Sequence, residues 1–119
     1  MNRESNILNR VRLAVSQAGG RLFRNNVGLF TTINGDKIRT GLTVGSADLI
    51  GWSPMIITQE MVGRQVAVFL SIEIKTAKGR PSKSQIIWRD VVLQAGGIAG
   101  IARSGDEALA IIQKGMSSD

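Results

Sequence analysis

The stretch Val66-Ala67-Val68-Phe69-Leu70-Ser71-Ile72-Glu73-Ile74-Lys75-Thr76 is the part of the sequence that decides the fold. It begins as a continuous apolar run, which is typical of a strand buried on both faces, and carries two charges near its end. Alternate residues of a strand point to one side, so Glu73 and Lys75 share a face. Because an unpaired buried charge is unstable, these two side chains need each other, a metal ion or a wet cleft.

The size and composition of the chain favour a single intracellular domain. With 119 residues, we expect one domain over residues 1–115 and a frayed tail at 116–119. No segment reaches the roughly 18 apolar residues of a membrane span, and the N-terminus lacks the apolar region of a secretion signal. We therefore expect a cytoplasmic protein with no membrane partner.

Three residue types that often carry chemistry are missing. The chain has no histidine, cysteine or tyrosine, which excludes thiol nucleophiles, histidine bases and ordinary structural zinc sites. Any chemistry must use Asp, Glu, Lys, Arg, Ser or Thr, and oxygen ligands of this kind suit Mg²⁺ or Mn²⁺. The net charge of +6 favours a polyanionic partner, although many small basic proteins bind nothing specific.

The N-terminal half predicts a helix, a strand and a hairpin. Residues 2–18 place apolar side chains, Ile7 among them, on one helical face and Arg12 elsewhere, and the glycines that follow end the helix. A short strand is expected at 21–25, and Asn34-Gly35 is a strong hairpin signal within 26–40. Glu4 lies at the rim of the apolar helical face, where either the helix dipole or a role in a site explains it.

The middle of the chain predicts a second acidic strand. Residues 47–52 read as an apolar strand with Asp48 near its beginning, and residues 58–63 read as a single helical turn. The strand 47–52 is a candidate hairpin partner of 66–76. That pairing would bring Asp48 and Glu73 to the same end.

The C-terminal part predicts two capped helices around a strand. Ser82 to Gln85 form a capping box for a helix that stops at Gly96-Gly97, and residues 98–102 form a strand. Ser104 to Glu107 repeat the capping pattern for a helix through Gln113. The expected fold class is α/β, with a mixed central β-sheet flanked by helices.

Asp48, Glu73 and Lys75 form the pattern Asp, then Glu-x-Lys. Two carboxylates at neighbouring strand ends can bind a divalent cation, which polarises a phosphoryl oxygen and activates a water molecule. Lys75 would orient that water or neutralise charge on the phosphorus. The backbone carbonyl of Ile74 is a candidate further ligand. A Glu-x-Lys pair alone is a weak signal, but here it follows an apolar run and precedes a basic turn.

This pattern resembles the PD-(D/E)xK nuclease superfamily, and within it the virus-type replication-repair nuclease (VRR-NUC) domain. The resemblance covers nearly the whole chain, and each of its motifs is weak by itself. The family usually has proline before the motif aspartate, where this chain has Ala47. The matching segments are Glu4, Arg24-Asn25-Asn26, Gly45 to Ile50, Ile72 to Thr76, and Ser82-x-x-Gln85-x-x-Trp88 leading to Gly96-Gly97.

The resemblance implies a restriction-endonuclease-like core and assigns roles to five side chains. Asp48 and Glu73 would be metal ligands and Lys75 the catalytic lysine. Gln85 would line the site and Glu4 would be the acid of the first helix. Both of these last two have structural alternatives, since capping explains Gln85 and the helix dipole explains Glu4.

Stand-alone members of this family resemble phage or bacterial homodimers that act on branched DNA such as four-way (Holliday) junctions. We therefore expect a Mg²⁺- or Mn²⁺-dependent DNA endonuclease, a homodimer without a nucleotide cofactor, in a bacterial or phage-infected cell. The first helix and residues 29–38 are candidates for the dimer surface. Expected phosphate contacts are Lys78, Arg80, Lys83 and Arg89 near the cleft, and Arg24 and Arg39 on the far rim.

Two other functions fit part of the sequence. A non-catalytic nucleic-acid-binding domain that retains the nuclease fold would explain the charge and the basic hairpin equally well. It would have no reason to keep Asp48, Glu73 and Lys75 beside a core. A small basic structural protein of a phage or ribosome would explain the charge but not the acids that flank apolar strands.

Overall fold

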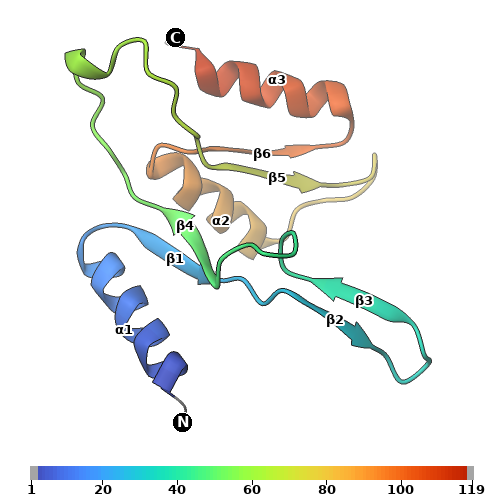
Figure 1. The fold of residues 1–119 in the computed structure, drawn as a ribbon. Helices are drawn as coiled ribbons and strands as arrows, with labels where there is room; N and C mark the ends of the chain where they lie inside the picture. The colour runs from blue at the N-terminus through green and yellow to red at the C-terminus, as the bar shows by residue number, and fades with distance from the viewer. Residues whose placement is uncertain (1–2, 118–119) are drawn as a thin grey trace. The chain divides into compact units, whose positions relative to one another are not determined.

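A computed structural model describes residues 3–117 and shows a mixed α/β protein (Figure 1). No helix among these residues is both long and apolar enough to cross a membrane. The chain divides into two compact units, Met1–Met55 and Ile56–Asp119. The elements are α1 (Arg3–Gln17), β1 (Arg21–Arg24), β2 (Gly28–Thr31), β3 (Lys37–Thr40), β4 (Leu49–Trp52), the 3₁₀ turn η1 (Gln59–Met61), β5 (Leu70–Ile74), α2 (Lys83–Gln94), β6 (Ile98–Ala102) and α3 (Gly105–Met116).

The first unit is built on the antiparallel pair of β1 and β4. In this pair Phe23 lies opposite Ile50 and Arg24 opposite Leu49. The rings of Phe23 and Trp52 pack with centroids 5.4 Å apart. The expected hairpin is confirmed as the antiparallel pair of β2 and β3.

Helix α1 covers its unit with a narrower face than the apolar pattern predicts. Its half-buried residues are Ser5, Leu8, Arg12 and Val15, whereas Ile7 and Val11 stay exposed. Arg12, which we expected away from the packed face, donates from Nε to the carbonyl of Leu22 at 3.3 Å. These half-buried residues follow one row along the helix, because a single short strand covers only a narrow stripe. Gly19, at a φ of 94°, ends the helix as expected.

The second unit is built on the parallel pair of β5 and β6. Ile72 lies opposite Gly100 and Glu73 opposite Ile101. The buried apolar side chains among the described residues are those of Val92 from α2 and of Ile98, Ala99 and Ala102 from β6. The core of this unit therefore lies around β6.

Helix α3 passes close to β6 because small residues allow it. A Cβ at Gly100 would lie 2.7 Å from Ile111 Cδ1, and a Cβ at Gly115 would lie 2.6 Å from Ile98 Cγ1. The helix continues to Met116, beyond the end we expected at Gln113. Met116, with which we expected the tail to begin, is the last residue of this helix, and Gly115 packs against β6. Of the expected tail, residues 118 and 119 lie outside the described range.

Strand β5 differs from the expected strand over 66–76. It covers only Leu70–Ile74, and both terminal side chains are exposed, Leu70 by 46% and Ile74 by 67%. The expectation of burial on both faces is therefore wrong for this strand. The physical reason is that α2 and α3 pack mainly against β6, which leaves less of β5 covered within this unit.

The strands of the described residues form three two-stranded sheets, and not the one mixed central sheet that we expected. Within these residues β4 pairs with β1, and β5 pairs with β6. The expected hairpin of 47–52 with 66–76 is therefore not formed among them. The connection between β4 and β5 contains Pro54, the turn η1 and Gly63 at a φ of 88°. Such a connection is much longer than a hairpin turn.

Gly51 tests the close approach between β1 and β4. A Cβ at this position would overlap the backbone carbonyl oxygen of Arg21, which cannot rotate away. We predict that Gly51→Ala lowers the free energy of unfolding by about 1–3 kcal/mol or more. Urea denaturation measures this change. The matched control is Gly105→Ala, because a Cβ there meets nothing within 4 Å. Equal stability of the two variants would contradict this packing.

Candidate active site

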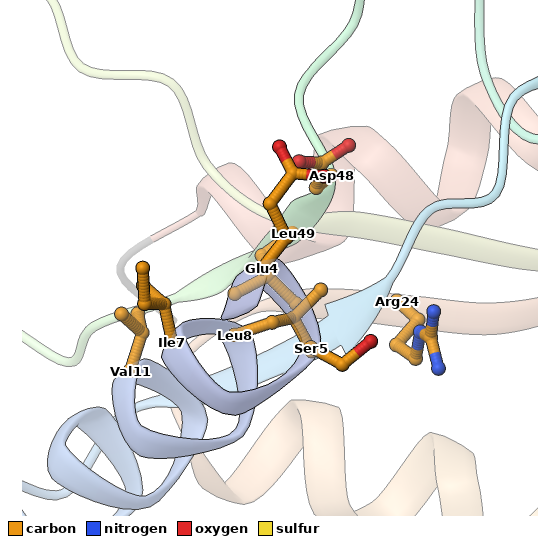
Figure 2. Close-up of a pocket in the computed structure, with 8 residues that line it drawn as sticks. All are labelled: Glu4, Ser5, Ile7, Leu8, Val11, Arg24, Asp48 and Leu49. Atoms are coloured by element: carbon orange, nitrogen blue, oxygen red, sulfur yellow. The ribbon is translucent and has the colours of Figure 1, made fainter. Parts of the chain in front are cut away.

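A pocket of about 500 Å³ in the first unit collects charged residues from α1, β1 and the start of β4. Glu4 comes from the first turn of α1, and Asp48 directly precedes β4. In Figure 2 both carboxylates extend toward the same side of the pocket, and Arg24 stands apart from them. The lining residues are Glu4, Ser5, Ile7, Leu8, Val11, Arg24, Asp48 and Leu49.

The backbone of β1 holds Asp48 in place. Arg24 pairs with Leu49 in the β1–β4 ladder, and the amide of Asn25 donates to the Asp48 carbonyl at 2.8 Å. Asp48 is therefore anchored through its main chain, and its carboxylate remains exposed. Because Glu4 lies on a helix that packs on β1, both acids take their positions from the same strand.

Arg24 lies closer to these acids than the sequence suggested. We expected it on the far rim of a cleft, whereas it lines the same pocket as Glu4 and Asp48. Its position follows from the ladder, because Arg24 is directly opposite the residue after Asp48. A cation beside two carboxylates in a pocket is suited to a phosphate that reaches the same place.

Asn25 belongs to a matching segment, but reasoning from the sequence gave it no role. It is only 9% exposed and is the buried polar side chain among the described residues. Its Nδ2 donates to Ser46 Oγ at 2.7 Å and to the Ala47 carbonyl at 2.8 Å. Its Oδ1 accepts from the Leu42 amide at 2.8 Å. The side chain therefore holds both ends of the loop that precedes Asp48.

Only a weak sequence signal for this role exists. Asn25 stands between a strand and a hairpin, a place where asparagine often makes local turns. Its partners lie 17 to 22 residues away, and no periodicity reports such contacts. Gly41 supports the arrangement at a φ of 76°, because a Cβ there would lie 2.9 Å from Asn25 Oδ1.

Glu73 and Lys75 lie at the carboxyl end of β5 in the second unit. Lys75 Nζ is 3.9 Å from Glu73 Oε2, and their side chains are 22% and 39% exposed. The expectation that both project from one face, side by side, is confirmed. The Lys75 amide donates to the Ala102 carbonyl at 3.1 Å, which continues the parallel ladder by one residue. Ile74, whose carbonyl we named as a candidate ligand, pairs with Ala102 at the end of the strand.

Gln85 takes part in the capping box that the sequence predicts. Its Oε1 accepts from the Ser82 amide at 2.9 Å, and its own amide donates to Ser82 Oγ at 3.2 Å. The structural explanation of Gln85 is thereby confirmed. Its role in a site stays a prediction, for which the side-chain Nε2 would have to serve.

Of the basic residues expected on DNA in the second unit, Lys78 and Arg80 lie in the turn after β5, and Lys83 and Arg89 lie in α2. Lys78, Arg80 and Lys83 are exposed, and Arg89 donates from Nε to Asp90 Oδ1 at 3.2 Å. Arg103 was not expected in this group. It follows β6 directly and donates from Nη2 to the Gly79 carbonyl at 3.0 Å. Arg103 therefore ties the basic turn to the end of the parallel pair.

The donor set fits a hard divalent cation in part. Among residues 3–117 no group of three or more Asp and Glu side chains could hold a metal ion together. The structure brings Glu4 and Asp48 to one pocket, and Mg²⁺ is often bound by one or two carboxylates completed by water and substrate phosphate. The residues present therefore fit such an ion when a phosphate supplies the remaining ligands.

Comparisons with protein-family models, with curated proteins and with solved structures find no match for this chain. A functional assignment therefore depends on the residues and geometry described above.

The Asn25 network generates a test of how Asp48 is held. We predict that Asn25→Ala lowers the free energy of unfolding by about 1–3 kcal/mol, because the Leu42 amide and the Ala47 carbonyl lose their partner. Hydrogen exchange of the Leu42 amide should rise in the same variant. Asn26→Ala, at an exposed neighbouring side chain, is the control. Unchanged exchange at Leu42 in Asn25→Ala would contradict the network.

Proposed function

We propose that this protein is a Mg²⁺- or Mn²⁺-dependent DNA endonuclease of the PD-(D/E)xK type, with a restriction-endonuclease-like core similar to VRR-NUC domains. The observation that supports it most is the pocket that Glu4, Asp48 and Arg24 share. Two carboxylates provide oxygen ligands, and an arginine provides charge-assisted hydrogen bonds to a phosphate. A pure binding domain needs cations but has no use for acids that would repel the same phosphate.

Glu4 and Asp48 would supply ligands for the ion at the pocket of the first unit, and Glu73 is the ligand that the resemblance assigns in the second unit. When bound, the ion would polarise a phosphoryl oxygen and lower the pKa of its water. The exposed Asp48 carboxylate suits this role because its main chain is anchored while its oxygens stay accessible. The carbonyl of Ile74 is the further candidate ligand.

Lys75 would orient the attacking water or neutralise charge on the pentavalent phosphorus. Its ammonium lies 3.9 Å from Glu73, so the pair keeps a cation next to a ligand carboxylate. Arg24 would contact a non-bridging phosphate oxygen at the pocket that it shares with Glu4 and Asp48, in place of the rim contact expected from the sequence. Gln85 Nε2 would contribute a further hydrogen bond, because only its Oε1 is used by the capping box.

The substrate class that we propose is branched DNA such as four-way junctions, cut by a homodimer. Two symmetric active sites can nick two symmetric strands, which is a physical reason for a dimer on a junction. The alternative is a non-catalytic nucleic-acid-binding domain with the same fold. The net charge of +6 supports both functions equally, so metal-dependent cleavage decides between them.

The mechanism predicts which substitutions abolish cleavage. Asp48→Asn, Glu73→Gln and Lys75→Met should each lower the rate of junction cleavage by at least about 10²-fold, while binding in EDTA is retained. Because Glu4 and Asp48 line one pocket, the double variant Glu4→Gln/Asp48→Asn should lose no more activity than Asp48→Asn alone. The assay uses a labelled four-way junction, a flap and a linear duplex with Mg²⁺ or Mn²⁺. Cleavage in EDTA, or full activity of Glu73→Gln, would refute the mechanism.

The phosphate contacts predict a change in salt dependence. Replacing any one of six cations by alanine should weaken binding to all sequences and reduce the slope of log K against log[salt] by about one unit. Arg64→Ala, at an exposed position outside this set, is the control. An unchanged slope would remove that residue from the interface. The six positions are Arg24, Arg39, Lys78, Arg80, Lys83 and Arg89.

A further inference from the structure

The β2–β3 hairpin is held rigidly at its turn. The Thr32 amide donates to the Asp36 carbonyl at 2.8 Å, and the Gly35 amide donates to the Thr32 carbonyl at 3.0 Å. The Asp36 amide donates back to Thr32 Oγ1 at 3.1 Å. Gly35 has a φ of 87°, a conformation that glycine adopts without strain. These bonds hold Ile33 at the turn, where its side chain is fully exposed.

The hairpin is also tied at its base to the candidate site. Thr40 Oγ1 donates to the Asn26 carbonyl at 2.7 Å, and the next residue but one, Leu42, donates to Asn25 Oδ1. In Figure 1 the turn lies at the end of the hairpin farthest from β1. The hairpin is thus an anchored arm with a defined tip.

One face of this arm is apolar and uncovered. Phe30 and Ile38 lie directly opposite each other, so their side chains share a face. Both are about half exposed, and Ile33 continues the apolar surface at the tip. We call Phe30, Ile33 and Ile38 the apolar edge. An exposed apolar cluster of this kind on a small protein usually marks a binding surface.

The other face of the arm is cationic. Arg39 lies opposite Leu29, and Lys37 lies opposite Thr31. Lys37 Nζ donates to Thr31 Oγ1 at 2.9 Å, which keeps its ammonium along the strand. The arm therefore presents Lys37 and Arg39 beside the exposed Leu29 on one side, and Phe30 and Ile38 on the other. At the tip, Ile33 lies three residues before the exposed Asp36.

We propose that the apolar edge is a wedge that contacts unstacked bases at the branch point of DNA, with Ile33 at its tip and Lys37 and Arg39 on the flanking phosphates. This inference rests on the proposed action on branched DNA. Apolar side chains such as Phe and Ile are known to insert between base steps, and a branch point exposes base faces without the cost of unstacking a duplex. A two-stranded ribbon is narrow enough to enter a groove or branch.

The charge of the arm favours DNA over a second copy of the chain. A second copy docked on the apolar edge would leave Lys37 and Arg39 unpaired on the opposite face, whereas flanking phosphates neutralise both cations. Stable dimers bury about 800 Å² and use about 20–30 residues on each partner. Three side chains at a hairpin tip are too few to hold such an interface alone.

Binding in EDTA tests the wedge without any cleavage. The probes are a four-way junction with 2-aminopurine at the branch point and a linear duplex of the same sequence. We expect Ile33→Ser to lower affinity for the junction about tenfold, to abolish the fluorescence increase on binding, and to leave duplex affinity unchanged. Ile33→Met, which keeps an apolar tip, should bind the junction as tightly as wild type. Phe30→Ser should lose junction affinity as Ile33→Ser does. Ile57→Ser, at an isoleucine that is also largely exposed, should behave as wild type.

Three results would overturn the wedge. Wild-type junction affinity in Ile33→Ser would do so, and so would an equal loss on junction and duplex. Sedimentation could show instead that Ile33→Ser changes the oligomeric state. If junction affinity then falls only in proportion to the loss of oligomer, the apolar edge would be assigned to a second copy of the chain. If the wild-type protein itself binds the junction no more tightly than the duplex, the branched substrate of the proposed function fails together with the wedge. If the wild type prefers the junction and Ile33→Ser keeps that preference, only the wedge fails.

Discussion

The buried amide of Asn25 is the interaction on which the first unit depends. A buried primary amide must satisfy donors and an acceptor at once, and Asn25 does so with Ser46, Ala47 and Leu42. Its backbone amide also bonds to Asp48. One residue thereby sets the conformation of residues 41–47, the start of β4 and the base of the hairpin. The pocket acid and the hairpin arm take their geometry from the same side chain.

The second unit depends on a different constraint, the parallel pairing of β5 with β6. Small residues on β6 and α3 let the helix approach the strand closely. The charges at the end of β5 then leave the core, since Glu73 and Lys75 are partly exposed. A partly exposed ion pair contributes only about 0–1 kcal/mol, so stability does not require it. A stable sheet would form as well with neutral side chains here, which favours a chemical role for the pair.

Local signals made much of the fold predictable. Both bonds of the capping box at Ser82 and Gln85 are formed, and β6 has the predicted bounds. The hairpin turn lies at Asn34-Gly35, as predicted. At Ser104 the side-chain cap is formed, but Glu107 Oε1 accepts from the Arg103 amide and not from the Ser104 amide that a capping box would use. Each of these features is decided by residues within about four positions of one another, which is the range that sequence patterns report.

The mistaken parts were decided by distant residues. The apolar pattern of α1 does not say how much of its face β1 can cover, so Arg12 and Ile7 were placed on the wrong sides. The apolar run before Glu73 does not say how many strands lie beside it. Arg24 entered the pocket because its ladder partner follows Asp48, a register that depends on the strand pairing. The role of Asn25 could not be predicted for the same reason, because Asn25 precedes the hairpin in the sequence and its partners follow it.

The anchoring of the arm and of Asp48 to one residue, Asn25, has a consequence for specificity. In the proposed complex, a branch held at Ile33 would bring a phosphodiester to the pocket acids at a separation set within one folded unit. Selection of a branched structure would then depend on that separation and on the shape of the DNA. It would need no reading of base edges, because apolar contacts with exposed base faces tolerate every base. An arm that were free to swing would lose this discrimination while keeping its charge, which is why the hydrogen bonds at both ends of the hairpin matter as much as the apolar edge itself.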